Sequence, residues 1–140
     1  MSDESVPDQL SNLRKVPLFA ELSDDVLNHV LERATEFEAA DGHVLVQRNH
    51  PGAGLFIIEE GTVTVELPDK KIGLGPGEFF GELALLSEGA THSARVCAAG
   101  PVRCLALARD DFDDLLDSQP RLAIAMLKAL ARRLAGTTSR

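Results

Sequence analysis

The segment around which this 140-residue chain is organised is Pro76-Gly77-Glu78-Phe79-Phe80-Gly81-Glu82-Leu83-Ala84-Leu85-Leu86, followed by Thr91-His92-Ser93-Ala94-Arg95-Val96. It combines glycines, two adjacent aromatic residues, carboxylates and a short apolar run with helical spacing, and a polar cluster then leads into an alternating strand. A strand, a glycine-rich turn and one helical turn together add little to a core. They do direct backbone N–H groups and a carboxylate toward a small polar ligand. The segment therefore predicts a ligand-binding site.

The residues on both sides of this segment form short β-rich runs separated by glycine and proline. The expected strands are Phe37–Ala39, Val44–Val46, Leu55–Ile58, Thr62–Leu67, Lys71–Leu74, Ser93–Ala98 and Val102–Leu107. The expected turns are Asp41-Gly42, Pro51-Gly52, Glu60-Gly61, Pro68-Asp69 and Gly100-Pro101. Many short strands with regular punctuation indicate a barrel or a double-sheet jelly roll, interrupted only by one or two helical turns over Gly81–Ser87.

Helical patterns flank the strands. A short helix over Leu10–Arg14 is expected to end before a proline, and an amphipathic helix over Asp24–Ala34 has Ser23 as its N-cap. After the strands, a short helix carries Phe112, Leu115 and Leu116, and a longer one begins at Pro120 and is expected to stop at Gly136. We therefore expect a flexible N-terminus over residues 1–9, a single domain over 10–135 and a polar tail over 136–140.

Composition limits the possible functions. The formal net charge of −8 weighs against direct binding of nucleic-acid phosphates. No apolar run is long enough to span a bilayer and no signal peptide is recognisable, so a cytoplasmic location without membrane contact is the expectation. The two cysteines, Cys97 and Cys104, are expected to be small buried residues, and they could lie across the Gly100-Pro101 turn from one another. No supported catalytic triad or metal-ligand spacing is present, so the chain is not expected to be an enzyme.

The order of elements and the Phe79-Phe80-Gly81-Glu82-Leu83-Ala84-Leu85-Leu86 run resemble the cyclic nucleotide-binding domain family, which includes catabolite activators, kinase regulatory subunits and cyclic nucleotide-gated channels. Further matches are Val16-Pro17-Leu18-Phe19, the Glu60-Gly61 and Pro76-Gly77 turns, and Ala108-Arg109-Asp110-Asp111-Phe112. The resemblance runs from about Leu10 to Arg133. It implies a mainly β fold: a β-roll with an N-terminal helix, a short embedded helix in the phosphate cassette and two C-terminal helices.

The resemblance also implies a role for each residue of the cassette. Glu82 would accept the ribose 2′-hydroxyl, and a carboxylate is a suitable acceptor for it. The backbone N–H groups around Gly81, Leu83 and Ala84 would face the cyclic phosphate, since they open a helical turn. Ser93 would donate its hydroxyl to a phosphate oxygen, and the Ala94 N–H would add a second donor.

One position departs from the family pattern. The phosphate-binding arginine of the family is replaced by His92. Arginine offers a permanent charge and a two-pronged donor, whereas histidine near neutral pH is mostly uncharged unless an anion raises its pKa. Arg95 lies three residues further on, and by strand alternation it shares a face with Ser93 rather than with His92. The pocket is therefore expected to be retained with weak or altered nucleotide binding.

Two function classes follow from the resemblance. The first is a regulatory module in signal transduction that binds a cyclic nucleotide. Of cAMP and cGMP, cAMP is the first candidate for the ligand. The C-terminal helices would move when the ligand is enclosed. In this reading Thr137 and Thr138 would contact the base, although they are equally well explained as plain C-terminal residues. The second is a non-catalytic interaction module that has lost the ligand and uses its last helix to form a homodimer or to contact a separate effector protein.

Overall fold

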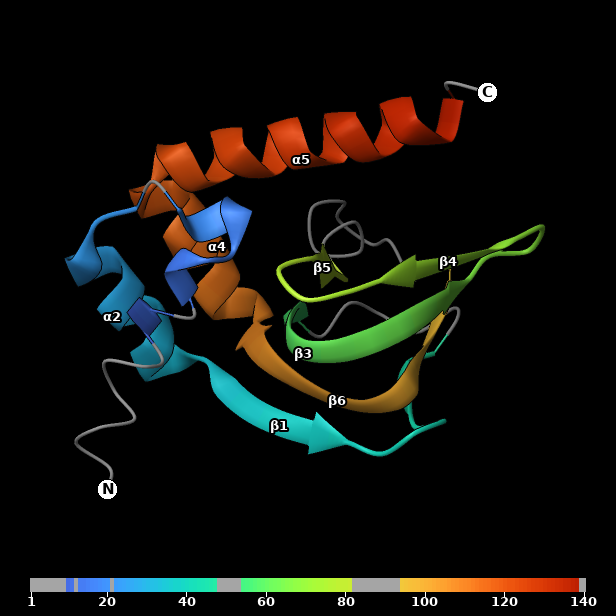
Figure 1. The fold of residues 1–140 in the computed structure, drawn as a ribbon. Helices are drawn as coiled ribbons and strands as arrows, with labels where there is room; N and C mark the ends of the chain where they lie inside the picture. The colour runs from blue at the N-terminus through green and yellow to red at the C-terminus, as the bar shows by residue number, and fades with distance from the viewer. Residues whose placement is uncertain (1–9, 12, 21, 48–53, 82–93, 139–140) are drawn as a thin grey trace.

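The computed structural model describes residues 10–11, 13–20, 22–47, 54–81 and 94–138, and within them it is an antiparallel sheet with helices packed along one side and across one edge (Figure 1). Residues 10–11 and 13–14 are helical. The elements that follow are η1 (Pro17–Phe19), α2 (Asp24–Arg33), β1 (Thr35–Ala39), β2 (Val44–Val46), β3 (Gly54–Glu66), β4 (Lys71–Leu74), β5 (Phe79–Phe80), β6 (Arg95–Ala108), α4 (Arg109–Ser118) and α5 (Pro120–Thr138). The mainly β fold with flanking helices that the sequence predicts is confirmed.

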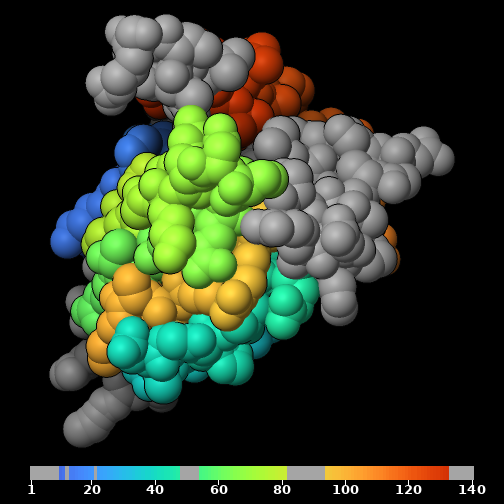
Figure 2. Space-filling view, turned by 90° about the vertical axis from the view of Figure 1, so that its right-hand side faces the viewer, coloured from blue at the N-terminus to red at the C-terminus, as the bar shows by residue number. Residues whose placement is uncertain are grey.

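The two longest strands, β3 and β6, pair with each other from Gly54↔Ala108 to Glu66↔Arg95. β1 and β2 pair with β6, whereas β4 and β5 pair with β3, so every other described strand attaches to this central pair. Figure 2 shows the far end of the sheet, where the β3–β4 hairpin in green, β6 in orange and the β1–β2 region in teal lie one above another.

Two predicted turns are wrong, because they lie inside continuous strands. Glu60-Gly61 was expected to separate two strands, yet both residues belong to β3, where the pairing register shifts between Ile58 and Thr62. Gly100-Pro101 likewise lies within β6. Glycine and proline at these points permit a bulge, which bends a strand without ending it.

The same correction applies to the two cysteines. Cys97 and Cys104 are buried, as expected, and both are free thiols. They do not lie across a turn from one another, because both are on the single strand β6.

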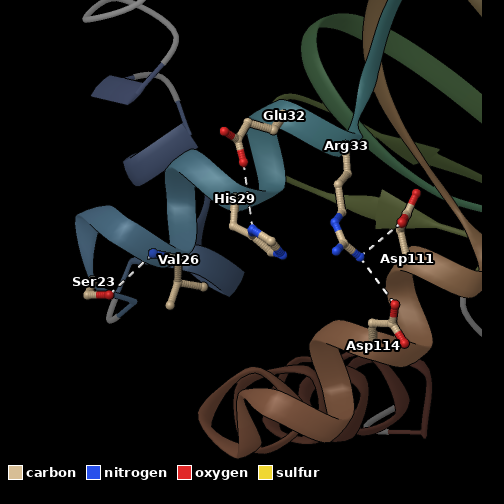
Figure 3. A network of polar contacts seen from close by, with 7 residues as sticks. All are labelled: Ser23, Val26, His29, Glu32, Arg33, Asp111 and Asp114. Carbon is tan, nitrogen blue, oxygen red and sulfur yellow. Dashed lines mark hydrogen bonds and ion pairs between the residues drawn. The ribbon is translucent and has the colours of Figure 1, made fainter.

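α2 has a capped N-terminus and ion pairs near its C-terminus. Ser23 accepts a hydrogen bond from the Val26 N–H at 3.3 Å, which confirms the predicted N-cap of α2. At the other end of α2, Arg33 extends toward α4, and its Nη1 lies 3.1 Å from Asp111 and 3.2 Å from Asp114 (Figure 3). Arg33 therefore connects α2 to α4.

The hydrophobic residues form two clusters on the two sides of the sheet. One cluster joins the helices to the sheet, and its fully buried members include Phe19, Leu27, Leu55, Phe112 and Leu122. The second lies within the curl of the strands and consists of Val46, Ile58, Val63, Leu74, Phe80, Val96, Ala98, Val102 and Cys104. The helical layer and the β-roll therefore each have a core of their own.

The C-terminal helix is longer than expected. Gly136 was predicted to stop it, but α5 continues to Thr138, since a glycine inside a helix costs only about 1 kcal/mol relative to alanine. Among the described helices, none has the length and apolar character needed to cross a membrane. Leu122 and Met126 anchor α5 in the core, whereas Ile124 and Leu127 are exposed.

Two leucines of α5 provide a matched test of this packing. Leu122→Ala is expected to lower the free energy of unfolding by about 2–5 kcal/mol, because the side chain is fully buried and leaves a cavity. Leu127→Ala makes the same change where 69% of the residue is exposed, and it should change stability by less than about 0.5 kcal/mol. Urea unfolding of both variants measures the difference, and equal losses would contradict the described orientation of α5.

Candidate functional site

The predicted phosphate cassette lies between β5 and β6, and the structure describes its two flanks. Gly81 follows β5 directly, and Ala94 precedes β6. The cassette residues Glu82, Leu83, Ala84, His92 and Ser93 lie outside the described residues. The backbones of Thr137 and Thr138 form the last turn of α5, and their side chains also lie outside the description.

Gly81 occupies a position that only glycine fits. Its φ of +94° is in the region that residues with a Cβ rarely adopt. A Cβ added there would lie 2.6 Å from the carbonyl oxygen of Gly54 and 3.4 Å from the ring of Phe56. The residue before Glu82 therefore packs closely against the start of β3.

Aromatic contacts fix the strand that leads to Gly81. Phe80 stacks on Phe56 of β3 with ring centroids 5.1 Å apart, and Phe37 of β1 meets Phe56 edge to face at 6.1 Å. Phe79 and Phe80 are both buried. Because aromatic pairs of this kind add to the burial of apolar area, β5 holds the first flank of the cassette firmly on β3.

The turn before β5 is fastened to β3 through its backbone. The Ile58 N–H donates to the Glu78 carbonyl at 2.9 Å, and the Gly77 N–H donates to the Ile58 carbonyl at 2.8 Å. Within the turn, the Gly75 N–H donates to the Glu78 carboxylate at 2.8 Å. The position of the Gly75–Glu78 turn therefore depends on the position of Ile58.

The other flank of the cassette carries an ion pair between β6 and β3. Arg95 opposes Glu66 in the β3–β6 register, and its Nη1 lies 3.4 Å from the Glu66 carboxylate. The arginine is about half exposed, so this contact contributes little to stability by itself. It does direct the side chain toward β3 rather than leaving it unengaged beside Ala94.

A charged cluster that the sequence did not predict lies at the bulge of β3. The side chain of Glu59 is only 7% exposed, and its Oε1 is 3.5 Å from the Arg103 Nε. The same nitrogen is 3.7 Å from Glu36, and the Arg103 Nη1 is 3.0 Å from Glu60. Three carboxyl groups from β1 and β3 therefore surround one guanidinium group on β6.

Burial changes the acidity of this cluster. The pKa of Glu59 is raised from 4.5 to about 7, mainly by its removal from water and then by hydrogen bonding with and repulsion from Glu36, while Arg103 acts in the opposite direction. Burial, with a smaller effect of the Glu59 charge, also raises the pKa of Cys104 to about 11. The thiol is therefore neutral and unreactive at physiological pH.

The sequence held no clear sign of this cluster. Glu59 and Glu60 stand next to a glycine, and such a pair is typical of an exposed turn. Only the bulge of β3 and the register of β1 on β6 bring Glu59 and Glu36 to the same guanidinium group. In the described ranges no three His, Cys, Asp or Glu side chains are grouped as metal ligands.

Replacing Gly81 tests the first flank of the cassette. Gly81→Ala is expected to cost about 2 kcal/mol or more, because the positive φ and the contact with the Gly54 carbonyl act together. Gly42→Ala is the control, since its φ is +84° but no atom lies within 4 Å of the added Cβ, so about 1 kcal/mol is expected. Thermal and urea unfolding compare them. Equal losses would contradict the close approach of Gly81 to β3.

The raised pKa of Glu59 predicts a pH dependence of stability. The native protein keeps a proton that the unfolded chain loses above pH 4.5, so this group makes stability fall as pH rises from 4.5 to about 7. Glu59→Gln should remove the fall, which is on the order of 1–3 kcal/mol, and leave the variant more stable than wild type at pH 8.

The matched control for this experiment is Glu60→Gln. Glu60 contacts the same guanidinium but is 66% exposed, so its variant should keep the wild-type slope. Urea unfolding between pH 5 and 8 supplies the comparison. If the free energy of unfolding changes with pH in the same way in Glu59→Gln and in wild type, Glu59 does not hold a proton near neutral pH.

The sequence and the fold of this chain are similar to those of known proteins. Residues 36–119 match the family model of the cyclic nucleotide-binding domain. A cyclic nucleotide-gated potassium channel of Rhizobium etli is 38% identical over 121 residues, which cover 86% of this chain and 34% of the channel. The chain therefore spans about a third of the length of that relative.

Two solved structures extend the likeness to the fold. The N-terminal domain of a transcriptional regulator from Streptomyces coelicolor is 34% identical with a TM-score of 0.66, and the match covers 91% of this chain and 95% of that domain. The catabolite activator protein of Thermus thermophilus is 31% identical with a TM-score of 0.74, over 86% of this chain and 59% of the activator. Fold, family match and identity agree, and the chain belongs to the cyclic nucleotide-binding domain family.

Proposed function

We propose that this regulatory domain binds a cyclic nucleotide, with cAMP as the first candidate, through a cassette formed by Gly81–Ala84 and His92–Ala94. Glu82 takes the ribose hydroxyl, the N–H groups from Gly81 to Ala84 take the cyclic phosphate, and Ser93 adds a hydroxyl donor. The observation that carries this proposal is the match of residues 36–119 to the cyclic nucleotide-binding domain, and Gly81 supports it by fixing the start of the cassette against β3.

The histidine at the arginine position sets the strength of binding. A hydrogen bond to a charged group contributes roughly 1.5–3 kcal/mol, so the loss of the guanidinium weakens binding by about tenfold to a hundredfold. Protonation of His92 restores part of that charge. Arg95 does not compensate readily, because its guanidinium contacts Glu66.

The C-terminal helices change their arrangement when the nucleotide binds, and this change is the signal. α5 packs on η1 and α4 through Leu122 and Met126, and α4 continues directly from β6, whose start adjoins the cassette. A ligand that binds one arrangement of these helices better than another shifts their populations. Thr137 and Thr138, in the last turn of α5, are the proposed contacts to the base.

The partner that receives this signal is a second copy of the domain or a separate effector. Ile124 and Leu127 are 53% and 69% exposed on α5, and they support this helix as the contact surface. The same residues favour the second candidate function, a non-catalytic interaction module that binds nucleotide weakly or not at all. In either case we propose a role without catalysis, nucleic-acid contact or membrane contact, in the cytoplasm, by the domain over residues 10–135.

Calorimetric titration with cAMP and cGMP tests the first function. Wild type is expected to bind cAMP more tightly at pH 6 than at pH 8, because the protonated imidazole partly replaces the guanidinium. His92→Arg should bind about tenfold to a hundredfold more tightly and lose that pH dependence, whereas Glu82→Ala should bind more weakly.

The control is His43→Arg, which makes the same substitution at an exposed position before β2 and should bind as wild type does. Equal wild-type affinities at the two pH values would remove His92 from the phosphate site. If neither wild type nor His92→Arg binds either nucleotide, the interaction module is the better account.

A further inference from the structure

Glu59 is the residue that the bulge of β3 leaves without a register partner. Ile58 opposes Cys104 on β6 and Glu60 opposes Arg103, and the register shifts between them. In a bulge the extra residue lies outside the regular ladder, and its side chain is redirected. Here the redirected side chain is a carboxyl group that is 93% buried, since its exposed fraction is 7%.

Arg103 compensates the charge of this carboxyl only in part. The Arg103 Nη1 is engaged by Glu60 at 3.0 Å, and only the Nε is shared between Glu59 and Glu36, at 3.5 and 3.7 Å. Among the described residues, neither Glu59 Oε1 nor Arg103 Nε has a hydrogen-bond partner. Glu36 and Glu60 are 40% and 66% exposed and remain in contact with water, whereas Glu59 is buried. The arrangement is therefore favourable when Glu59 holds a proton beside Glu36.

The bulge is connected to the cassette by a short series of backbone contacts. Ile58, the residue before Glu59, exchanges hydrogen bonds with Gly77 and Glu78 of the next turn. A cavity of about 260 Å³ lies at this point, lined by Glu59, Arg103, Lys15, Val16 and Gly77 among others. The turn then continues into β5 and Gly81, so backbone hydrogen bonds and chain connectivity join the bulge to the first flank of the cassette.

We propose that Glu59 is a proton-linked positioning residue: its protonated carboxyl, paired with Glu36, holds the bulge and the Gly75–Glu78 turn in place for nucleotide binding. Loss of the proton leaves the buried Glu59 carboxylate beside the Glu36 carboxylate, which is 40% exposed, and their repulsion displaces Ile58 and the turn tied to it. Nucleotide affinity therefore falls as the proton is lost. The affinity part of this inference rests on the proposed function, whereas the positioning part concerns the nucleotide-free protein.

The other charged groups around Glu59 do not reverse this direction. They come from five parts of the chain, and are Glu36 of β1, Glu60 of β3, Arg103 and Cys104 of β6, Lys15 of the N-terminal segment and Glu78 of the turn. Arg103 and Lys15 are the cations among these groups. Cys104 remains neutral there, because burial raises its pKa. The change in this range therefore belongs to the carboxyl pair.

Amide hydrogen exchange in the nucleotide-free protein tests the positioning part. Protection of the Gly77 and Ile58 amides, corrected for the intrinsic pH dependence of exchange, should fall by about tenfold between pH 6 and 8 in wild type. Glu59→Gln carries a neutral side chain of the same shape and should keep protection constant. Glu60→Gln contacts the same arginine from an exposed position and should behave as wild type. Protection that is independent of pH, or equal slopes in wild type and Glu59→Gln, would overturn the proposal.

Nucleotide titration tests the affinity part in the His92→Arg background, where no histidine titrates at the phosphate site. Affinity for cAMP should fall from pH 6 to pH 8 in His92→Arg and should be constant in His92→Arg/Glu59→Gln. Parallel profiles would overturn the link between Glu59 and binding. If no variant binds cAMP or cGMP at any pH, the proposed function fails and the affinity part fails with it. The exchange measurement then decides the positioning part alone.

Discussion

The pairing of β3 with β6 is the constraint on which the rest of the structure depends. The two strands run antiparallel from Gly54↔Ala108 to Glu66↔Arg95, and the other described strands pair with one or the other. α4 begins at the residue after β6 ends, so the helical layer starts from the same pair. A bulge near Glu60 interrupts the register of β3. Because a bulge increases local twist, it helps the sheet to curl into a roll.

This central pair also explains how the candidate site is held. Gly81 packs against the Gly54 end of β3, and Ala94 adjoins the Glu66 end through Arg95. Both flanks of the cassette are therefore positioned by contacts with β3. The bulge lies between them and contains the one carboxyl group that the described structure buries against another carboxyl. A change of charge at the bulge therefore has a direct structural route to the turn before β5.

The sequence predicted most of the secondary structure, and its errors have a common physical origin. β2 and β4 were predicted with their observed bounds, and the cap of α2 was identified, because periodicity and capping are local properties. β3 and β6 were each divided in two, since glycine and proline occur in bulges as well as in turns. The helix stop at Gly136 was wrong because one glycine costs only about 1 kcal/mol relative to alanine, which does not by itself end a helix. The Glu59 cluster could not be predicted, because three strands distant in sequence create it.

The most direct test of the account is an NMR titration of the ¹⁵N-labelled domain with cAMP. The backbone amides of Gly81 and Ala94 are the described members of the proposed cassette at its two ends, so a nucleotide bound in the cassette is expected to affect both. The account predicts that both resonances shift in a saturable manner with the same dissociation constant. Resonances at these two residues that stay unchanged at millimolar cAMP, in wild type and in His92→Arg, would contradict it.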